Sequence, residues 1–215
     1  FIEDENLSPK ALDYIQNDTE FAIVIENLNG NWIDMYKYTL TNYISEITMR
    51  KVITNIVRGL EKLISKGVYH LDIKLENIML NSVTYNIKFI DFESSLYEIE
   101  ENPKHCGCVG TVGYSSYEAL SGEAYDVRKN MVFEIGCLIY ISFEHRLLFD
   151  TENDYENITS IQYKTCSKYA RKLINKCLAF NPDDRINLNE FLNELWFQKT
   201  SLKQRIFHFL LKKLN

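Results

Sequence analysis

The sequence lacks several features that would place it in other classes of protein. It has no uninterrupted apolar stretch of the roughly 20 residues needed to cross a bilayer, and no secretory signal opens it. The net charge of −6 argues against a nucleic-acid-binding protein, because such proteins usually carry a basic surface. The 5 cysteines are an odd number at irregular spacing, which favours a reducing intracellular compartment, cytoplasmic or nuclear, over a disulfide framework.

Composition indicates an ordinary globular chain. Of the 215 residues, 46% are hydrophobic and 25% are charged. The 8 glycines and 3 prolines form no linker, and no internal repeat is present, so we expect one core or a domain with a small appendage. The chain begins with Phe1 rather than methionine, so we expect that upstream sequence has been removed or left unrecorded.

The first half of the chain alternates between strand and helix patterns. Residues 20–26 are an apolar, partly β-branched run bounded by acids, which predicts a buried strand. Residues 32–40 indicate a helix, and residues 49–64 predict the clearest one, because apolar residues recur there at three- and four-residue spacing before Gly67. Residues 84–90 indicate a further strand.

Helical patterns dominate the second half. Residues 132–143 are nearly all apolar and predict a buried central helix, since a surface helix would show a polar face. Residues 169–180 and 188–197 predict two amphipathic helices. The turn between them, residues 181–184, carries aspartates that can cap the second helix.

The most informative segment is residues 69–80, Tyr-His-Leu-Asp-Ile-Lys-Leu-Glu-Asn-Ile-Met-Leu, followed by Asp91-Phe92. It resembles the catalytic loop and metal-binding segment of eukaryotic protein kinases, whose pattern is His-Arg-Asp-x-Lys-x-x-Asn and then Asp-Phe-Gly. In that family the histidine, here His70, packs beneath the phenylalanine and is not a base. The resemblance therefore implies a structural role for His70 and Phe92.

The same resemblance implies a role for each polar residue in phosphoryl transfer from ATP. The Asp72 carboxylate would accept the proton of the substrate hydroxyl, and the Lys74 ammonium would screen charge on the transferring group. Asn77 and Asp91 would hold Mg²⁺, which prefers hard oxygen ligands.

The resemblance continues downstream. Residues 110–118, Gly-Thr-Val-Gly-Tyr-Ser-Ser-Tyr-Glu, resemble the kinase segment Gly-Thr-x-x-Tyr-x-Ala-Pro-Glu. In the family the threonine, here Thr111, bridges the catalytic aspartate and lysine on the substrate side. The glutamate pairs with a late arginine, so Glu118 and Arg185 are a predicted ion pair.

The implied fold is α+β and protein-kinase-like, with a predominantly helical large lobe. We expect residues 1–28 to be a remnant of the small lobe with the hinge strand, residues 29–198 to be the large lobe, and residues 199–215 to be a basic amphipathic helix. Two motifs, Leu-Ala-x-x-Pro-x-Asp-Arg and Lys-Phe-Ile-Asp-Phe, look most like the Pim and PAS-domain kinase branch.

Six residues are expected to contact ATP, and one of them is Asp91, through the metal and the phosphates. Glu26 and Leu28 lie at the position of the hinge, and Leu28, unlike a proline, keeps its N–H for the adenine. Met79, Lys74 and Asn77 follow from the catalytic-loop resemblance.

Three departures from the family pattern put turnover in doubt. Leu71 replaces the arginine that normally receives an activation-loop phosphate. Glu93 replaces the glycine of Asp-Phe-Gly, where it restricts φ and adds a carboxylate beside the metal site. Met131 stands where a buried aspartate normally holds the catalytic-loop backbone, and losing that acceptor would loosen the loop.

Three further patterns have two interpretations each. Residues 105–108, His-Cys-Gly-Cys, lack the second ligand pair of a structural zinc site, so we interpret them as an ordinary loop. Ser94, Ser95 and Tyr97 are interpreted as solvated loop residues rather than phosphorylation sites. The basic amphipathic stretch 202–214 suits packing on the lobe surface, or docking on a partner or an anionic membrane.

Two functions remain open from the sequence. The first is a Ser/Thr protein kinase whose Gly-rich loop and strand lysine are absent from this sequence; Glu76, at a position that faces arginine in basophilic kinases, suggests a protein substrate with a basic motif. The second is a catalytically impaired kinase-like module that acts as a decoy or scaffold. Such a module would bind proteins through an exposed apolar face.

Overall fold

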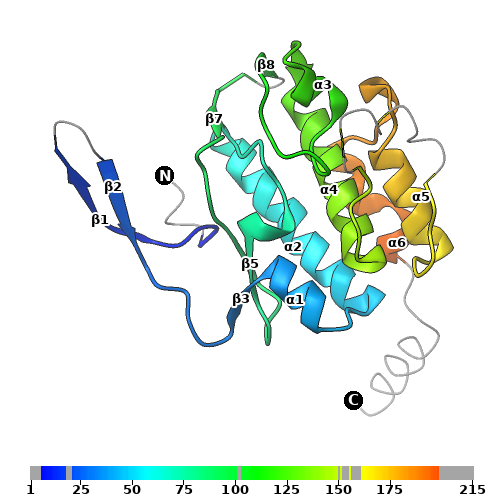
Figure 1. Cartoon of the computed structure of the whole chain (residues 1–215), viewed down its shortest axis with the longest axis horizontal. Helices are drawn as coiled ribbons and strands as arrows, with labels where there is room; N and C mark the ends of the chain where they lie inside the picture. The colour runs from blue at the N-terminus through cyan, green and yellow to red at the C-terminus, as the bar shows by residue number, and fades with distance from the viewer. Residues whose placement is uncertain are drawn as a thin grey trace, which may run out of the picture.

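The structure is a computed structural model that describes residues 6–17, 21–100, 103–149, 151, 155 and 161–198. A helical body surrounds the two long helices α2 and α4, and a narrow hairpin projects from one side (Figure 1). The strands are β1 (Ala11–Gln16), β2 (Phe21–Ile25), β3 (Trp32–Asp34), β4 (Val68–Tyr69), β5 (Ile78–Asn81), β6 (Ile87–Phe89), β7 (Leu96–Tyr97), β8 (Lys104–His105) and β9 (Tyr125–Asp126). The α-helices are α1 (Met35–Thr41), α2 (Glu46–Ser65), α3 (Tyr117–Ser121), α4 (Val127–Glu144), α5 (Lys168–Cys177) and α6 (Leu195–Gln198), and the 3₁₀ turns are η2 (Leu75–Asn77), η4 (Pro182–Asp184) and η5 (Leu188–Asn193). This mixture confirms the predicted α+β class.

Helix α2 forms where the apolar spacing predicts it but begins earlier, at Glu46. The Ser45 hydroxyl caps its first turn by accepting a hydrogen bond from the Thr48 N–H at 3.1 Å. Gly67 follows the helix with a φ of +76°, and a Cβ there would lie 2.8 Å from the Glu98 carbonyl oxygen. Only glycine fits that position, so the sequence signal for the helix end has a steric cause.

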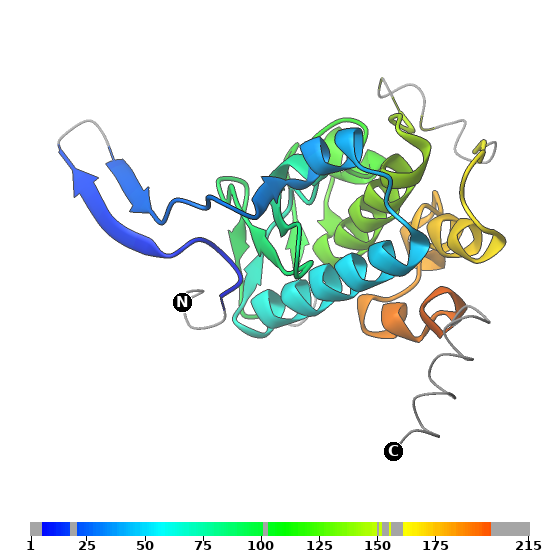
Figure 2. The same ribbon diagram turned by 90° about the horizontal axis from the view of Figure 1, so that it is seen from below.

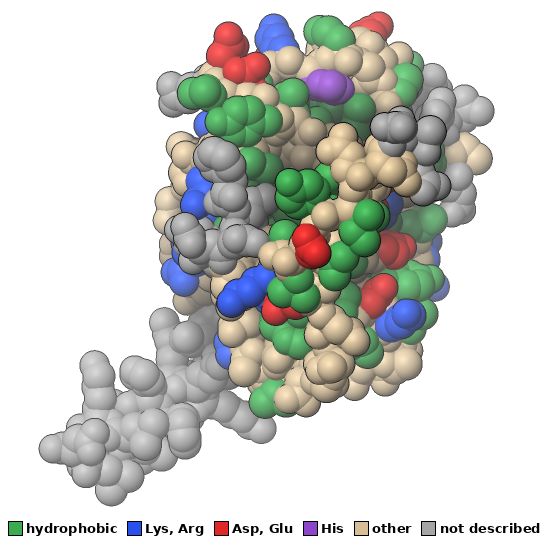
Figure 3. Space-filling view, turned by 90° about the vertical axis from the view of Figure 1, so that its left-hand side faces the viewer, with side chains coloured by type: hydrophobic (Ala, Val, Ile, Leu, Met, Phe, Trp, Pro, Cys, Tyr) green, Lys and Arg blue, Asp and Glu red, His purple; other side chains and the backbone are tan. Residues whose placement is uncertain are grey.

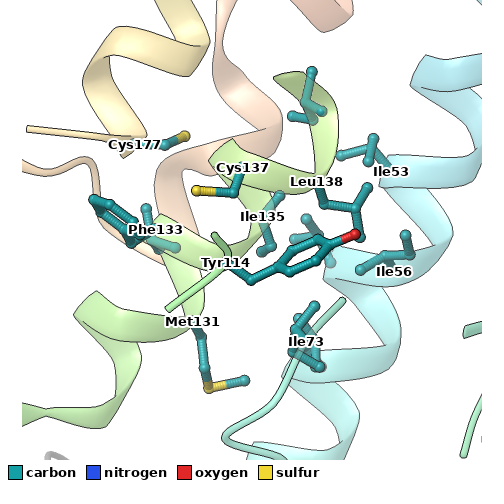
Figure 4. Close-up of a cluster of buried hydrophobic side chains, with 14 of the residues drawn as sticks. Ile53, Ile56, Ile73, Tyr114, Met131, Phe133, Ile135, Cys137, Leu138 and Cys177 are labelled. Carbon is teal, nitrogen blue, oxygen red and sulfur yellow. The ribbon is translucent and has the colours of Figure 1, made fainter. Parts of the chain in front are cut away.

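Helix α4 is the central element, as residues 132–143 predict, and it runs from Val127 to Glu144. It is buried on nearly every side. In Figure 4 its Leu138 faces Ile53 and Ile56 of α2. On the α5 side, a Cβ at Gly136 would lie 2.5 Å from the Cys177 Cβ, so the two helices approach closely where α4 has no side chain.

The prediction of a continuous helix over residues 188–197 is wrong. The segment forms η5 and then α6, separated at Glu194, whose φ of −64° and ψ of 147° are extended. The Glu194 carboxylate contacts Lys176 of α5 at 2.7 Å. Phe191 lies before this break and Trp196 lies after it, and both side chains are buried. A single uninterrupted helix would not by itself bring both of them into the core.

The prediction of a helix over residues 32–40 is wrong at its start. Residues 32–34 form β3, which pairs antiparallel with β5, and β5 pairs with β6. Helix α1 begins only at Met35. The side chain of the preceding residue, Asp34, accepts a hydrogen bond from the Lys37 N–H at 3.0 Å. Asp34 therefore ends the strand and caps the helix. Of the predicted strand 84–90, only residues 87–89 form β6, because Thr84 lies in the preceding turn.

Residues 20–26 were predicted to form a buried strand, and the burial is wrong. Residues 21–25 form β2, which pairs only with β1 in a two-stranded antiparallel hairpin. Both strands are exposed along their whole described length. The hairpin reaches away from the helical body (Figures 1 and 2), so no described layer covers either face.

No helix among the described residues is both long enough and apolar enough to span a membrane. The predicted amphipathic helix of residues 199–215 lies outside the described residues.

Candidate active site

The catalytic loop joins β4 to β5 and ends in the turn η2. Three buried apolar side chains, Leu71, Ile73 and Leu75, alternate with polar ones and anchor the loop in the core. Leu71 has a φ of +63°, a conformation that costs energy for a side chain with a Cβ. The Leu71 side chain is apolar and completely buried, so it provides no charged receptor for a phosphate on Ser94, Ser95 or Tyr97.

A closed set of hydrogen bonds surrounds the Asp72 carboxylate. The Lys74 ammonium donates to Asp72 Oδ2 at 2.7 Å and to the Thr111 hydroxyl at 2.9 Å. The Thr111 hydroxyl donates in turn to Asp72 Oδ1 at 2.7 Å. Asn77 Nδ2 donates to Asp72 Oδ2 and to the Asp72 carbonyl oxygen, each at 3.0 Å. The bridge expected of Thr111 is therefore present, and Asp72 is fixed in one orientation by three side chains.

Asp91 lies two residues after the end of β6. The Ile90 N–H donates to the Asn77 carbonyl oxygen at 3.0 Å, which joins the end of β6 to the end of the catalytic loop. Asp91 is exposed and has a φ of +63°, a conformation that aspartate tolerates better than most residues. Glu93 is also exposed but is not among the described residues with positive φ, so its Cβ meets no such strain.

His70 and Phe92 are in ring contact, with centroids 4.8 Å apart. His70 Nε2 lies 3.1 Å from the Ile90 carbonyl oxygen, which can only accept, so this nitrogen carries the proton. Burial lowers the pKa of His70, and the imidazole is therefore neutral at pH 7. The packing is that of a structural residue, as expected.

The acceptor missing at Met131 is supplied by Glu134, one helical turn later. Met131 is completely buried and belongs to the hydrophobic core, part of which Figure 4 shows. Glu134 Oε2 accepts a hydrogen bond from the Ile73 N–H of the catalytic loop at 3.3 Å. The catalytic-loop backbone therefore has an acceptor on α4 although Met131 offers none. The sequence did contain a signal, because Glu134 is the acid inside an apolar stretch, and acids are almost never fully buried without a partner.

The predicted ion pair between Glu118 and Arg185 is present and is bidentate. Arg185 is buried, and its guanidinium also donates to the carbonyl oxygens of Ala179, Phe180 and Lys129. We call residues 110–116 the substrate-side loop. The ion pair holds helix α3 (Tyr117–Ser121), which follows this loop, against the segment around Arg185.

Two of the expected nucleotide contacts, Glu26 and Leu28, follow β2 at the base of the hairpin. The ammonium of Lys88, a buried residue of β6, pairs with the Glu26 carboxylate and donates to the Ser8 carbonyl oxygen at 3.0 Å. The Glu26 N–H donates to the Lys10 carbonyl oxygen at 2.8 Å. Leu28 is half-buried just beyond. The role of Lys88 as the hinge anchor was not predicted, and no sequence pattern indicated it.

On the substrate side, Glu76 lies beside Tyr114. Burial and the nearby Glu76 carboxylate raise the pKa of the Tyr114 hydroxyl. Met79 lies in β5 between Asp34 and Lys88 in the register of the sheet. Among the described residues, no group of three or more His, Cys, Asp or Glu side chains is placed to hold a metal ion.

The family model described as "Protein kinase domain" matches residues 9–197 of the chain. The chain therefore belongs to the protein kinase family.

Curated relatives agree with this family. The chain is 30% identical over 203 residues to CBL-interacting protein kinase 31 of Oryza sativa subsp. japonica, covering 88% of this chain and 44% of the relative. It is 29% identical over 199 residues to CBL-interacting serine/threonine-protein kinase 13 of Arabidopsis thaliana, covering 87% of this chain and 38% of the relative. It is 30% identical over 196 residues to the carbon catabolite-derepressing protein kinase of Candida glabrata, covering 88% and 31% respectively.

The chain thus spans less than half the length of these relatives. They are not Pim or PAS-domain kinases, so the prediction of that branch is wrong. The two motifs that suggested this branch are residues 88–92, which contain Asp91, and residues 178–185, which end at the buried Arg185. We interpret these positions as fixed by the kinase fold rather than by one branch of the family.

Proposed function

We propose that the chain carries the catalytic lobe of a Ser/Thr protein kinase, which transfers the γ-phosphoryl group of ATP to protein hydroxyls inside the cell. The observation that supports this is the set of hydrogen bonds on Asp72. Phosphoryl transfer needs a carboxylate held toward the incoming hydroxyl and a cation beside the transferring group. Asp72 and Lys74 are 2.7 Å apart and are both tied to Thr111, and so they supply this pair.

The residues present fit ATP and Mg²⁺. Asn77 directs its amide nitrogen at Asp72, which leaves the amide oxygen available to a metal ion. Asp91 supplies an exposed carboxylate, one residue after the Ile90 N–H that bonds to the Asn77 carbonyl oxygen. In kinase sites Mg²⁺ is bound by one or two such groups together with the nucleotide phosphates, whose charge it neutralises. Glu26 and Leu28 would face the adenine through the Glu26 carbonyl oxygen and the Leu28 N–H.

Lys74 in the catalytic loop favours serine or threonine over tyrosine as the acceptor, by the family resemblance. Glu76 favours a substrate with a basic residue before the acceptor. The net charge of −6 agrees with a basic partner.

A kinase-like binding module is the second candidate, and one observation favours it. Apolar side chains are exposed along the hairpin, and Figure 3 shows apolar side chains gathered on the face from which it projects. They are Leu12, Tyr14, Ile15, Phe21, Ile23, Val24 and Ile25. Exposed apolar patches of this kind often mark protein-binding surfaces.

The test measures, with magnesium present, ATP-dependent phosphorylation of a basic serine peptide by the chain in a protein that also supplies the Gly-rich loop and the strand lysine that this sequence lacks. Asp72→Asn should lower the rate by about a hundredfold or more, the scale of losing a positioned base, while ATP affinity stays nearly unchanged. Asp91→Asn should weaken both. The control, Asp184→Asn, makes the same chemical change at an exposed residue of η4 and should change neither.

If the wild-type chain binds Mg-ATP but transfers nothing, or if Asp72→Asn retains the wild-type rate, the kinase proposal is wrong for this chain. The binding module would then be the better description.

A further inference from the structure

Glu134 is a completely buried acid in the middle of the apolar helix α4. Three groups donate to its carboxylate or lie positioned to do so: the Ile73 N–H at 3.3 Å, the Ser115 hydroxyl at 3.2 Å and the Asn130 side-chain amide at 3.0 Å. Ile73 belongs to the catalytic loop and Ser115 to the substrate-side loop. The Glu134 carboxylate therefore contacts two loops that lie about forty residues apart in the sequence. The Thr111–Asp72 hydrogen bond joins the same two loops.

The contacts close a ring around the proposed base. The Thr111 N–H donates to the Ser115 hydroxyl at 3.0 Å, and the Ser115 hydroxyl donates to Glu134 Oε1. The Thr111 hydroxyl donates to Asp72 Oδ1. From Asp72 the chain passes to Ile73, whose N–H returns to Glu134 Oε2. Glu134 thus restrains Asp72 from both sides, through its neighbour Ile73 and through Thr111.

The ring depends on a close approach that only glycine permits. At Gly110, a Cβ would lie 1.9 Å from the Ser115 hydroxyl oxygen, and the φ of Gly110 is +109°. The Tyr155 hydroxyl donates to the Ser115 carbonyl oxygen at 2.6 Å and fixes the backbone from the other side. The Ser115 side chain is therefore built into this position rather than free to rotate to solvent.

Backbone strain explains why a restraint is needed there. Leu71 has a positive φ immediately before Asp72, and such a conformation persists only where the surroundings hold it. The Ile73 N–H lies two residues on, and its bond to Glu134 is the contact that joins this strained stretch to the rigid helix α4. The environment of the carboxylate is costly in itself, because it is removed from water and lies near Asp72.

We propose that Glu134 and Ser115 are positioning residues for Asp72, with Glu134 replacing, one turn later on α4, the acceptor that Met131 does not provide. The proposal rests on the proposed function for its catalytic consequence, but its structural part does not. Neither residue touches ATP or the substrate; both act through Ile73 and Thr111.

The test combines hydrogen exchange with kinetics on the full chain. Exchange is measured above the pKa of Glu134, where both of its oxygens only accept. There Glu134→Gln keeps the shape but replaces one acceptor oxygen with a donor, so one link of the ring must fail. Exchange of the Ile73 or the Thr111 amide should accelerate by about tenfold or more, the scale of one lost hydrogen bond. Ser115→Ala should accelerate Thr111 while leaving Ile73 protected. Ser142→Ala removes another buried hydroxyl of α4, which bonds only within the helix to the Leu138 carbonyl oxygen at 2.8 Å, and should change neither amide.

In an active chain, Glu134→Gln and Ser115→Ala should lower kcat with KM for ATP unchanged. The double variant Met131→Asp with Glu134→Ser should recover the protection of Ile73 that Glu134→Ser alone loses, because it moves the acid back by one turn.

The proposal is wrong if Glu134→Gln leaves both amides protected, or if exchange rises equally throughout α2 and α4, which would mean a general loss of stability. If the wild-type chain transfers no phosphate, the proposed function fails while the exchange measurements still decide the role of Glu134 and Ser115.

Discussion

Removing Arg185 should destabilise the lobe more than any surface charge can. In Arg185→Ala, the Glu118 carboxylate loses its bidentate partner, and three carbonyl oxygens lose a donor. The guanidinium also lies 4.9 Å from the centre of the Phe133 ring, so packing is lost with the charge. Breaking a buried pair from one side costs about 3–5 kcal/mol.

That loss converts into a measurable shift. For a chain of this length each kcal/mol lowers the melting midpoint by about 2–4 °C, so Arg185→Ala should melt roughly 6–20 °C below wild type. Glu118→Gln should cost less, about 1–3 kcal/mol, because its amide oxygen still accepts from the guanidinium.

The control is the exposed pair between Lys176 and Glu194, whose lysine side chain is 54% exposed. Lys176→Ala should cost about 1 kcal/mol or less. The assay is thermal unfolding of the four proteins followed by circular dichroism. If Arg185→Ala has the same melting midpoint as Lys176→Ala, the Glu118–Arg185 pair is not buried as described and the reasoning fails.

Three further predictions concern pH and the hinge. Burial and the charge of Asp72 raise the pKa of Glu134 to about 8, so the folded chain holds a proton that the unfolded chain releases near the ordinary value of 4.5. The free energy of unfolding should therefore fall as pH rises from about 5 to 8, and Glu134→Gln should remove this slope in denaturant titrations. Burial opposes ionisation of Glu144, but three backbone N–H groups outweigh it and lower its pKa to about 2. Its stabilising contribution should be present at neutral pH and lost as pH falls from about 4.5 to 2, and Glu144→Gln should flatten that acid limb. Lys88→Met should make residues 26–31 more susceptible to limited proteolysis, with the melting midpoint little changed, because Glu26 loses its partner at the hinge.

The sequence was sufficient where the local pattern and the packing agree. Helix α2 and helix α4 followed from apolar spacing, and the bridge of Thr111 to Asp72 and Lys74 followed from the family resemblance. The bonds of Asn77 to Asp72 were not predicted.

The failures have a common cause in partners that are distant along the chain. An apolar run such as residues 21–25 predicts a strand, but its burial depends on whether another layer covers it. Residues 188–197 have a helical pattern, yet the contact between Glu194 and Lys176 lies at the point where the helix breaks. Glu134 and Lys88 act through contacts 61 and 62 residues away, which no local pattern contains.

Because the hairpin is exposed, one free energy of unfolding does not describe both the hairpin and the helical body. A two-stranded ribbon is marginal in water unless other structure supports it, and here the support comes at its base, through Lys88 and the bond between the Phe89 N–H and the Leu7 carbonyl oxygen at 2.7 Å. Its opening is therefore a local event of low free energy, separate from the cooperative unfolding of the helices. A melt followed by helical circular dichroism reports the second event and is blind to the first. The residues that would meet the adenine lie at the boundary between these two units.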